Sequence, residues 1–130
     1  MDLSPEQARY RVRLETRKWL VIDATMDNEV SVEAEDGDPR GVVDLGMSIR
    51  RAGWDQVPGW PRDVQGFETW PAPGQTSTIS LSRPQWDLVL SALERWAAVS
   101  DRSPDPGSAD DAAQSRAIAE LVRVQLAEQE

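Results

Sequence analysis

Hydrophobic and polar residues alternate near the start of the chain, a pattern typical of half-buried β-strands. The inward set is Tyr10, Val12, Leu14 and Thr16, and the outward set is Arg9, Arg11, Arg13, Glu15 and Arg17. The run Trp19-Leu20-Val21-Ile22 shows no alternation, which favours a strand covered on both faces. Residues 4–7, Ser4-Pro5-Glu6-Gln7, offer an alternative reading as a helix cap before the first strand.

A second alternation follows a turn at Asp27-Asn28. It sets Val30, Val32 and Ala34 against Glu29, Ser31, Glu33 and Glu35. We therefore predict strands over residues 9–35. If these strands share one sheet, the arginines at 9, 11 and 13 lie across from the glutamates at 29, 33 and 35. Each such pair contributes about 0.2–1 kcal/mol, so we favour an ion-pair ladder over a phosphate-binding stripe in this acidic chain.

Residues 41–53 fit two patterns, because Val43, Leu45, Met47 and Ile49 alternate while helical spacing is also present. Gly53 followed by Trp54 resembles a helix C-terminus and favours a short helix over residues 44–52. Residues 53–75 are rich in Trp, Pro and Gly and are predicted to form an irregular connector. A short strand is predicted over residues 76–81.

The C-terminal third carries the strongest local signals. Ser82-Arg83-Pro84-Gln85 matches a capping box, with Leu81 and Trp86 placed as its hydrophobic staple. Apolar stripes predict helices over residues 83–100 and 109–128. Their inner faces are expected to be Trp86, Val89, Leu90, Leu93, Trp96 and Ala97 in the first helix, and Ala113, Ala117, Ile118, Leu121, Val122 and Gln125 in the second.

These elements predict a single α+β domain over residues 1–130. A small, mainly antiparallel sheet from the N-terminal half would be covered by a C-terminal antiparallel helical hairpin, because the loop between the two helices is short. The length of 130 residues is typical of one domain.

Composition excludes several kinds of chemistry. The chain has no histidine and no cysteine, and its only lysine, Lys18, follows no glycine-rich loop. Imidazole bases, thiolate nucleophiles, thiolate metal sites and a Walker A phosphate loop are therefore absent. Any catalysis would depend on carboxylates, so a non-catalytic protein without a cofactor is favoured over an enzyme. With no long apolar run and no basic leader, we expect a cytoplasmic protein without a membrane segment.

Two groups of residues are candidate binding sites. Trp60 and Trp70 precede prolines in the predicted connector, and tryptophan is enriched among binding hot spots. The densest acidic cluster consists of Glu33, Glu35, Asp36 and Asp38. Its spacing does not match a helix-loop-helix calcium site, so no metal site is predicted.

The net charge of −9 and the tryptophan content resemble those of bacterial immunity, antitoxin and phage-encoded inhibitor proteins. This resemblance of composition implies a non-catalytic protein-binding module, with a basic surface on the partner protein. Direct nucleic-acid binding is not expected, because phosphates repel an acidic chain. The alternatives are a small-ligand or sugar binder or a carboxylate-dependent enzyme with a Trp-lined pocket, and a structural or assembly subunit.

Overall fold

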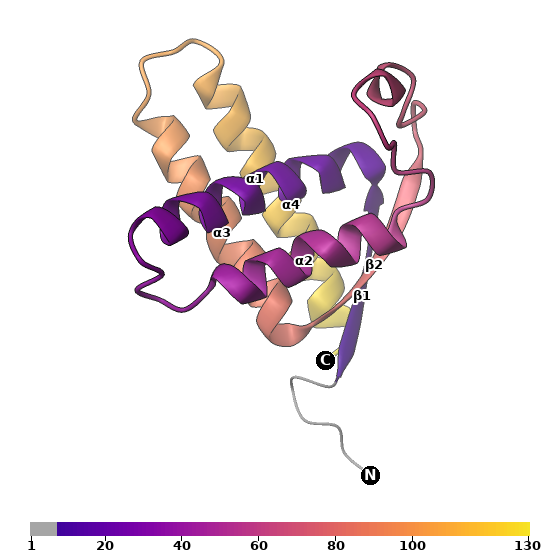
Figure 1. The fold of residues 1–130 in the computed structure, drawn as a ribbon, viewed down its shortest axis with the longest axis horizontal. Helices are drawn as coiled ribbons and strands as arrows, with labels where there is room; N and C mark the ends of the chain where they lie inside the picture. The colour runs from indigo at the N-terminus through magenta and orange to yellow at the C-terminus, as the bar shows by residue number, and fades with distance from the viewer. Residues whose placement is uncertain (1–7) are drawn as a thin grey trace.

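The structure is a computed structural model that describes residues 8–130, so the alternative cap at residues 4–7 lies outside the described residues. The fold is α+β, with a small antiparallel sheet and C-terminal helices, as predicted (Figure 1). In chain order the elements are β1 (Arg9–Glu15), α1 (Thr16–Glu35), α2 (Val43–Gln56), the short 3-10 helix η1 (Gln65–Glu68), β2 (Thr76–Ser82), α3 (Arg83–Asp101) and α4 (Ser108–Glu128).

Strands β1 and β2 pair as an antiparallel ribbon. Val12 lies opposite Ile79, and Leu14 lies opposite Ser77. These residues share the buried face, and Val12 and Ile79 have no exposed surface. The alternation in residues 10–14 therefore predicted both the strand and its inner face correctly. The predicted strand over residues 76–81 is likewise confirmed.

Residues 16–35 form the helix α1, so the prediction of strands beyond residue 15 is wrong. The buried positions recur with helical spacing, at Trp19, Ile22, Met26 and Val30. Val32, which the alternation placed inward, is 45% exposed. Both periods are present in this segment, and burial of the helical stripe against the rest of the protein overrides the preference of β-branched residues for strands.

The charge ladder predicted for β1 is also absent, because its acidic side lies on a helix. Arg11 and Arg13 face Ser80 and Thr78 across the ribbon. Glu29 and Glu33 are instead buried on α1.

Helix α2 confirms the predicted helix near residues 44–52 but extends beyond it to Gln56. Gly53 is therefore not the residue that ends the helix. It is buried inside α2, where a Cβ atom would lie 2.2 Å from Nε1 of Trp19. The glycine is required by the close approach of two helices, whereas Trp54 is 39% exposed.

The predicted helices α3 and α4 are confirmed, including the capping box. Ser82 accepts a hydrogen bond from the Gln85 backbone N–H, and the Gln85 side chain accepts one from the Ser82 N–H at 2.8 Å. The inner face of α4 is rotated from the predicted one, because Ala113 and Ala117 are exposed. Its buried positions are Ala112, Ser115, Ile118, Ala119, Val122 and Leu126. Alanines on both sides of the helix make its apolar stripe ambiguous in sequence.

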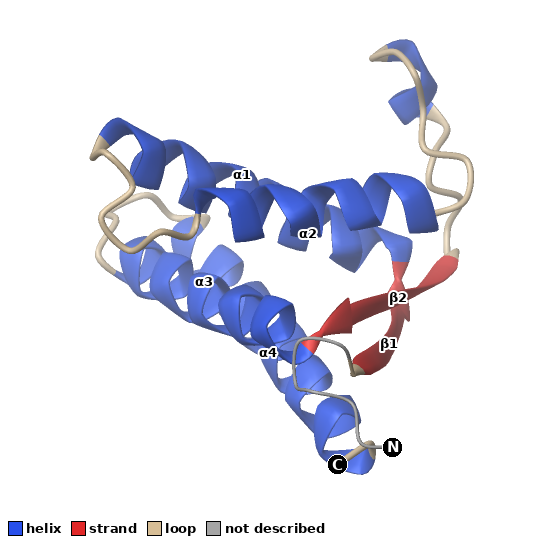
Figure 2. Ribbon diagram, turned by 60° about the horizontal axis from the view of Figure 1, so that its bottom comes forward, coloured by secondary structure: helices blue, strands red, loops and turns tan. Residues whose placement is uncertain are grey.

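The helices form two antiparallel pairs that cross, with the ribbon at one end (Figures 1 and 2). The pair α1–α2 lies over the pair α3–α4, and the connector containing η1 projects from one corner. The core lies between the pairs and the ribbon. Trp19 of α1 and Trp86 of α3 meet edge to face there, with their ring centroids 6.4 Å apart. Helix α1 also packs against both strands, so the sheet is covered by α1 as well as by the C-terminal hairpin.

Glutamine side chains close both outer edges of the ribbon. Gln125 and Gln129 of α4 each bond a backbone N–H and a backbone C=O of β1, at Arg13 and Arg11 respectively, over 2.6–2.8 Å. Gln56 of α2 makes the same pair of bonds to Ser80 of β2. The amides replace a neighbouring strand, so these edge groups are not available for pairing with another chain.

Replacing both Gln125 and Gln129 with leucine should lower the free energy of unfolding by about 1–2 kcal/mol, because the lost bonds are solvent-exposed. It should also raise the apparent mass at high protein concentration, because the edge of β1 becomes free. Urea denaturation and sedimentation velocity measure these effects. Gln114→Leu on the same helix is the control. A double variant as stable and as monodisperse as this control would contradict the protective role of the two amides.

Candidate functional site

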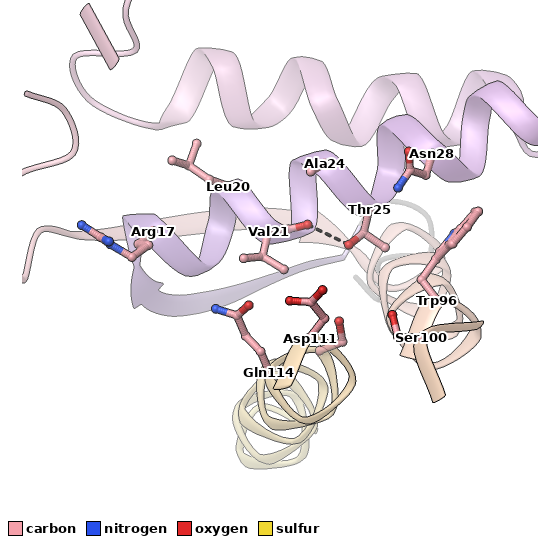
Figure 3. Close-up of a pocket in the computed structure, with 11 residues that line it drawn as sticks. Arg17, Leu20, Val21, Ala24, Thr25, Asn28, Trp96, Ser100, Asp111 and Gln114 are labelled. Carbon is pink, nitrogen blue, oxygen red and sulfur yellow. Dashed lines mark hydrogen bonds between the residues drawn. The ribbon is translucent and has the colours of Figure 1, made fainter. Parts of the chain in front are cut away.

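A groove of about 510 Å³ lies between α1 and the end of the helical hairpin (Figure 3). Its volume lies within the range of about 300–1,000 Å³ that is usual for ligand pockets. Helix α1 contributes Arg17, Leu20, Val21, Ala24, Thr25 and Asn28; α3 contributes Trp96 and Ser100; and α4 contributes Asp111, Gln114 and Ser115. The groove exists because α1 packs on α3 but leaves the first turns of α4 uncovered.

The groove has an apolar wall and a polar rim. Leu20 and Val21 lie on one turn of α1 and Ala24 on the next, and Trp96 adds its ring from α3. In Figure 3 the side chain of Asp111 extends from α4 toward α1. The Thr25 hydroxyl donates to the backbone carbonyl of Val21 at 2.7 Å, so the polar atom that it presents is already bonded.

The rim is acidic at the start of α4. Asp110 and Asp111 occupy its first turn, where the helix dipole favours negative charge. An ion pair also joins α3 to α4, where Arg116 donates two hydrogen bonds to Asp101. These bonds lower the pKa of the Asp101 carboxyl and raise the pKa of Arg116. The negative charge of Asp101 is thus balanced by Arg116, whereas Asp111 forms no ion pair with another residue of the range 8–130.

Glu33, one of the predicted acidic binding residues, is part of a buried ion cluster. Glu29 and Glu33 are 2% and 4% exposed on the inner side of α1. Arg40 donates from its Nη2 to Glu29 at 2.6 Å and from its Nε to Glu33 at 3.0 Å. Arg95 of α3 approaches Glu29 at 3.4 Å. The bond to Glu29 is the largest cause of a raised pKa for Arg40, so the charge on the guanidinium is retained.

The other three members of the predicted acidic cluster have different environments. Asp38 has a positive φ of 58° and accepts hydrogen bonds from the backbone N–H groups of Val42 and Val43, so it caps the start of α2. Glu35 and Asp36 are exposed. The four carboxylates therefore do not converge on a common site. Within residues 8–130, no group of three or more Asp, Glu, His or Cys residues could hold a metal ion.

Trp60 and Trp70 are brought together in the projecting connector. With Phe67 they form an aromatic cluster whose ring centroids are 5.4–6.2 Å apart. Trp70 also donates from Nε1 to the carbonyl of Pro58 at 3.1 Å. Both tryptophans are half-buried, while Phe67 and Val64 are 42% and 86% exposed. The prediction of a Trp/Pro-rich connector identified the segment but not Phe67 as a member of the cluster.

The groove residues were missed by sequence reasoning for one reason. Leu20, Val21 and Ala24 were assigned to strands, so their shared helical face was not recognised. Trp96 was placed on an inner face, and it does pack partly against the core. Trp54, Trp60 and Trp70 line neither this groove nor a second hollow between the ribbon and α2.

No helix in the described range has both the length and the apolar character needed to cross a bilayer. No family model, curated protein or solved structure matches the chain.

Proposed function

We propose that the protein is a non-catalytic binding module that holds an apolar side chain of a partner protein in the groove between α1 and the hairpin. The groove itself carries this proposal, since a hollow with an apolar wall and a polar rim suits an anchor side chain. A buried apolar anchor surrounded by polar contacts is how many protein interfaces obtain most of their affinity.

The partner is expected to present a basic surface around its anchor. Asp111 lines the groove, Asp110 precedes it in the first turn of α4, and the chain carries a net charge of −9. Opposite charges accelerate association and select the partner, and salt screens the attraction. This partner chemistry fits an inhibitor or antitoxin-like role, in which an acidic protein covers a basic functional surface.

A non-catalytic role is supported by the state of the carboxylates. Glu29, Glu33 and Asp38 are engaged with arginines or backbone groups. A general acid or base needs a carboxyl group that can reach a substrate. Asp111 is the acidic residue that lines the groove, and one carboxylate alone does not provide an acid–base pair.

Ala24→Arg should abolish partner binding or weaken it at least tenfold. Ala24 is exposed on α1 and lines the groove, so a long charged side chain can occupy the hollow without entering the core. Ala34→Arg, at another exposed alanine of α1, is the matched control. The experiment captures proteins from the native host with wild type and both variants, and then measures the affinity of the captured protein by calorimetry at two salt concentrations.

The proposal requires equal affinity for wild type and Ala34→Arg, and weaker binding at high salt. A partner that binds Ala24→Arg as tightly as wild type would place the interface elsewhere. The aromatic cluster of the connector is then the next candidate surface, since Val64 and Phe67 are exposed. The affinity of the captured protein for Val64→Ser is therefore measured in the same experiment.

A small-ligand binder is the second candidate function, favoured by the groove volume of about 510 Å³ and by the ring of Trp96. Indole is a suitable probe, because its size is that of a single aromatic side chain. Nuclear magnetic resonance shifts at Val21, Ala24 and Trp96 on addition of indole, together with no protein captured by wild type, would favour this function over the first.

A further inference from the structure

Three arginines of β1 form a row on the outer face of the ribbon. Arg9, Arg11 and Arg13 alternate with the buried residues of the strand, and all three are exposed. Two residues of an extended strand span about 6.8 Å, so the row repeats at that interval. The opposite strand places the hydroxyl groups of Ser80 and Thr78 beside Arg11 and Arg13.

A second hollow, of about 370 Å³, begins where this row ends. Arg9 and Ser80 line it from the ribbon, and Arg51 and Ser48 line it from α2. Gln85 accepts a hydrogen bond from the guanidinium of Arg9 at 3.4 Å and so helps to orient it. The hollow therefore brings together two guanidinium groups, two serines and the carboxylate of Asp55 at the end of the arginine row.

Four of the arginines that form no ion pair lie together on this surface. Six arginines form ion pairs: Arg40, Arg50, Arg83, Arg95, Arg116 and Arg123. In the described part of the chain the other seven form none, although acidic residues outnumber basic ones by 23 to 14. Arg9, Arg11, Arg13 and Arg51 lie on this face, and Arg17, Arg62 and Arg102 lie elsewhere. A locally positive face on an acidic protein is complementary to an anionic partner.

We propose that this face, defined by Arg9, Arg11, Arg13 and Arg51, binds a short acidic segment of another protein in an extended conformation. Alternate side chains of an extended segment repeat at about the same 6.8 Å as the arginine row. Guanidinium groups bind carboxylates through two parallel hydrogen bonds. One carboxylate would enter the hollow between Arg9 and Arg51, and the next would meet Arg11 and Arg13.

The segment is held by its side chains rather than by joining the sheet. Gln56, Gln125 and Gln129 already occupy the edge groups of the ribbon, so strand addition is blocked. The positive face is also short, since Glu15 stands at its far end and Asp55 lines the hollow itself. A nucleic acid would extend beyond the face onto acidic surface, which favours a short peptide.

The test uses the full chain labelled with ¹⁵N and an acetylated, amidated peptide Glu-Thr-Glu-Thr-Glu. Titration at low salt should shift resonances of residues 9–13, 48–56 and 78–82. Arg11→Gln combined with Arg13→Gln should weaken binding at least tenfold, because both side chains are exposed and can be changed without disturbing the core. Arg62→Gln combined with Arg102→Gln, at exposed arginines elsewhere, should bind as wild type does.

Three results would overturn the proposal. They are equal binding of the neutral peptide Gln-Thr-Gln-Thr-Gln, equal affinity of the Arg11/Arg13 variant, or tighter binding of a five-nucleotide oligothymidylate than of the acidic peptide. The Ala24→Arg variant should bind the acidic peptide normally, because the groove and the arginine face are separate surfaces. The outcome is therefore independent of the function proposed for the groove.

Discussion

Replacing Arg40 with methionine should lower the free energy of unfolding by about 3 kcal/mol, because it leaves two buried carboxylates without their main cation. Glu29 and Glu33 lie one turn apart on α1, and both are at most 4% exposed. After the change, Arg95 at 3.4 Å would be the remaining cation near Glu29. Partial exposure of Arg40 itself places the loss at the lower end of the range for broken buried pairs. Urea denaturation measures it.

Two further variants separate this effect from a general loss of charge. Arg102→Met, at an exposed arginine of the hairpin loop, should change stability by less than about 0.5 kcal/mol. Adding Glu29→Gln and Glu33→Gln to the Arg40→Met protein should restore at least half of the lost stability, because neutral amides need no counter-ion. If Arg40→Met has the same urea midpoint as wild type, the ion cluster of Arg40, Glu29 and Glu33 does not stabilise the loop that joins α1 to α2.

Gly53→Ala should destabilise the protein by about 2–3 kcal/mol, although alanine is normally the better helix former by about 1 kcal/mol. The added methyl group would lie 2.2 Å from Nε1 of Trp19, a ring with no exposed surface. Neither the helix backbone nor the buried indole can move away without disturbing the core. Thermal and urea unfolding both report this loss.

A control and a rescue identify the cause of this loss. Gly107→Ala adds a methyl group with no atom within 4 Å, so it should leave stability nearly unchanged. Trp19→Phe replaces the ring that the new methyl group would meet, so Gly53→Ala should cost less in the Trp19→Phe protein than in wild type. Equal costs in both backgrounds would contradict the packing explanation.

Part of the candidate groove lies on α1, an element that was predicted from sequence as strands. Leu20, Val21 and Ala24 share one face only if residues 16–35 are helical. The same error placed Glu29 and Glu33 on a solvent-facing strand opposite the arginines. Trp60 and Trp70 were singled out as candidate binding residues from their Pro-rich surroundings, but their contacts with each other and with Phe67 depend on the path of the connector.

Local interactions explain what the sequence by itself determined. The strands β1 and β2, the capping box at Ser82, the two C-terminal helices and the α+β class all follow from patterns within about twenty residues. Tertiary packing decided between helix and strand for α1, because both periods occur there and only the helical one places Trp19 and Met26 in the shared core. It also decided the burial of Glu29, the close approach at Gly53 and the groove, because each depends on which helix lies against α1.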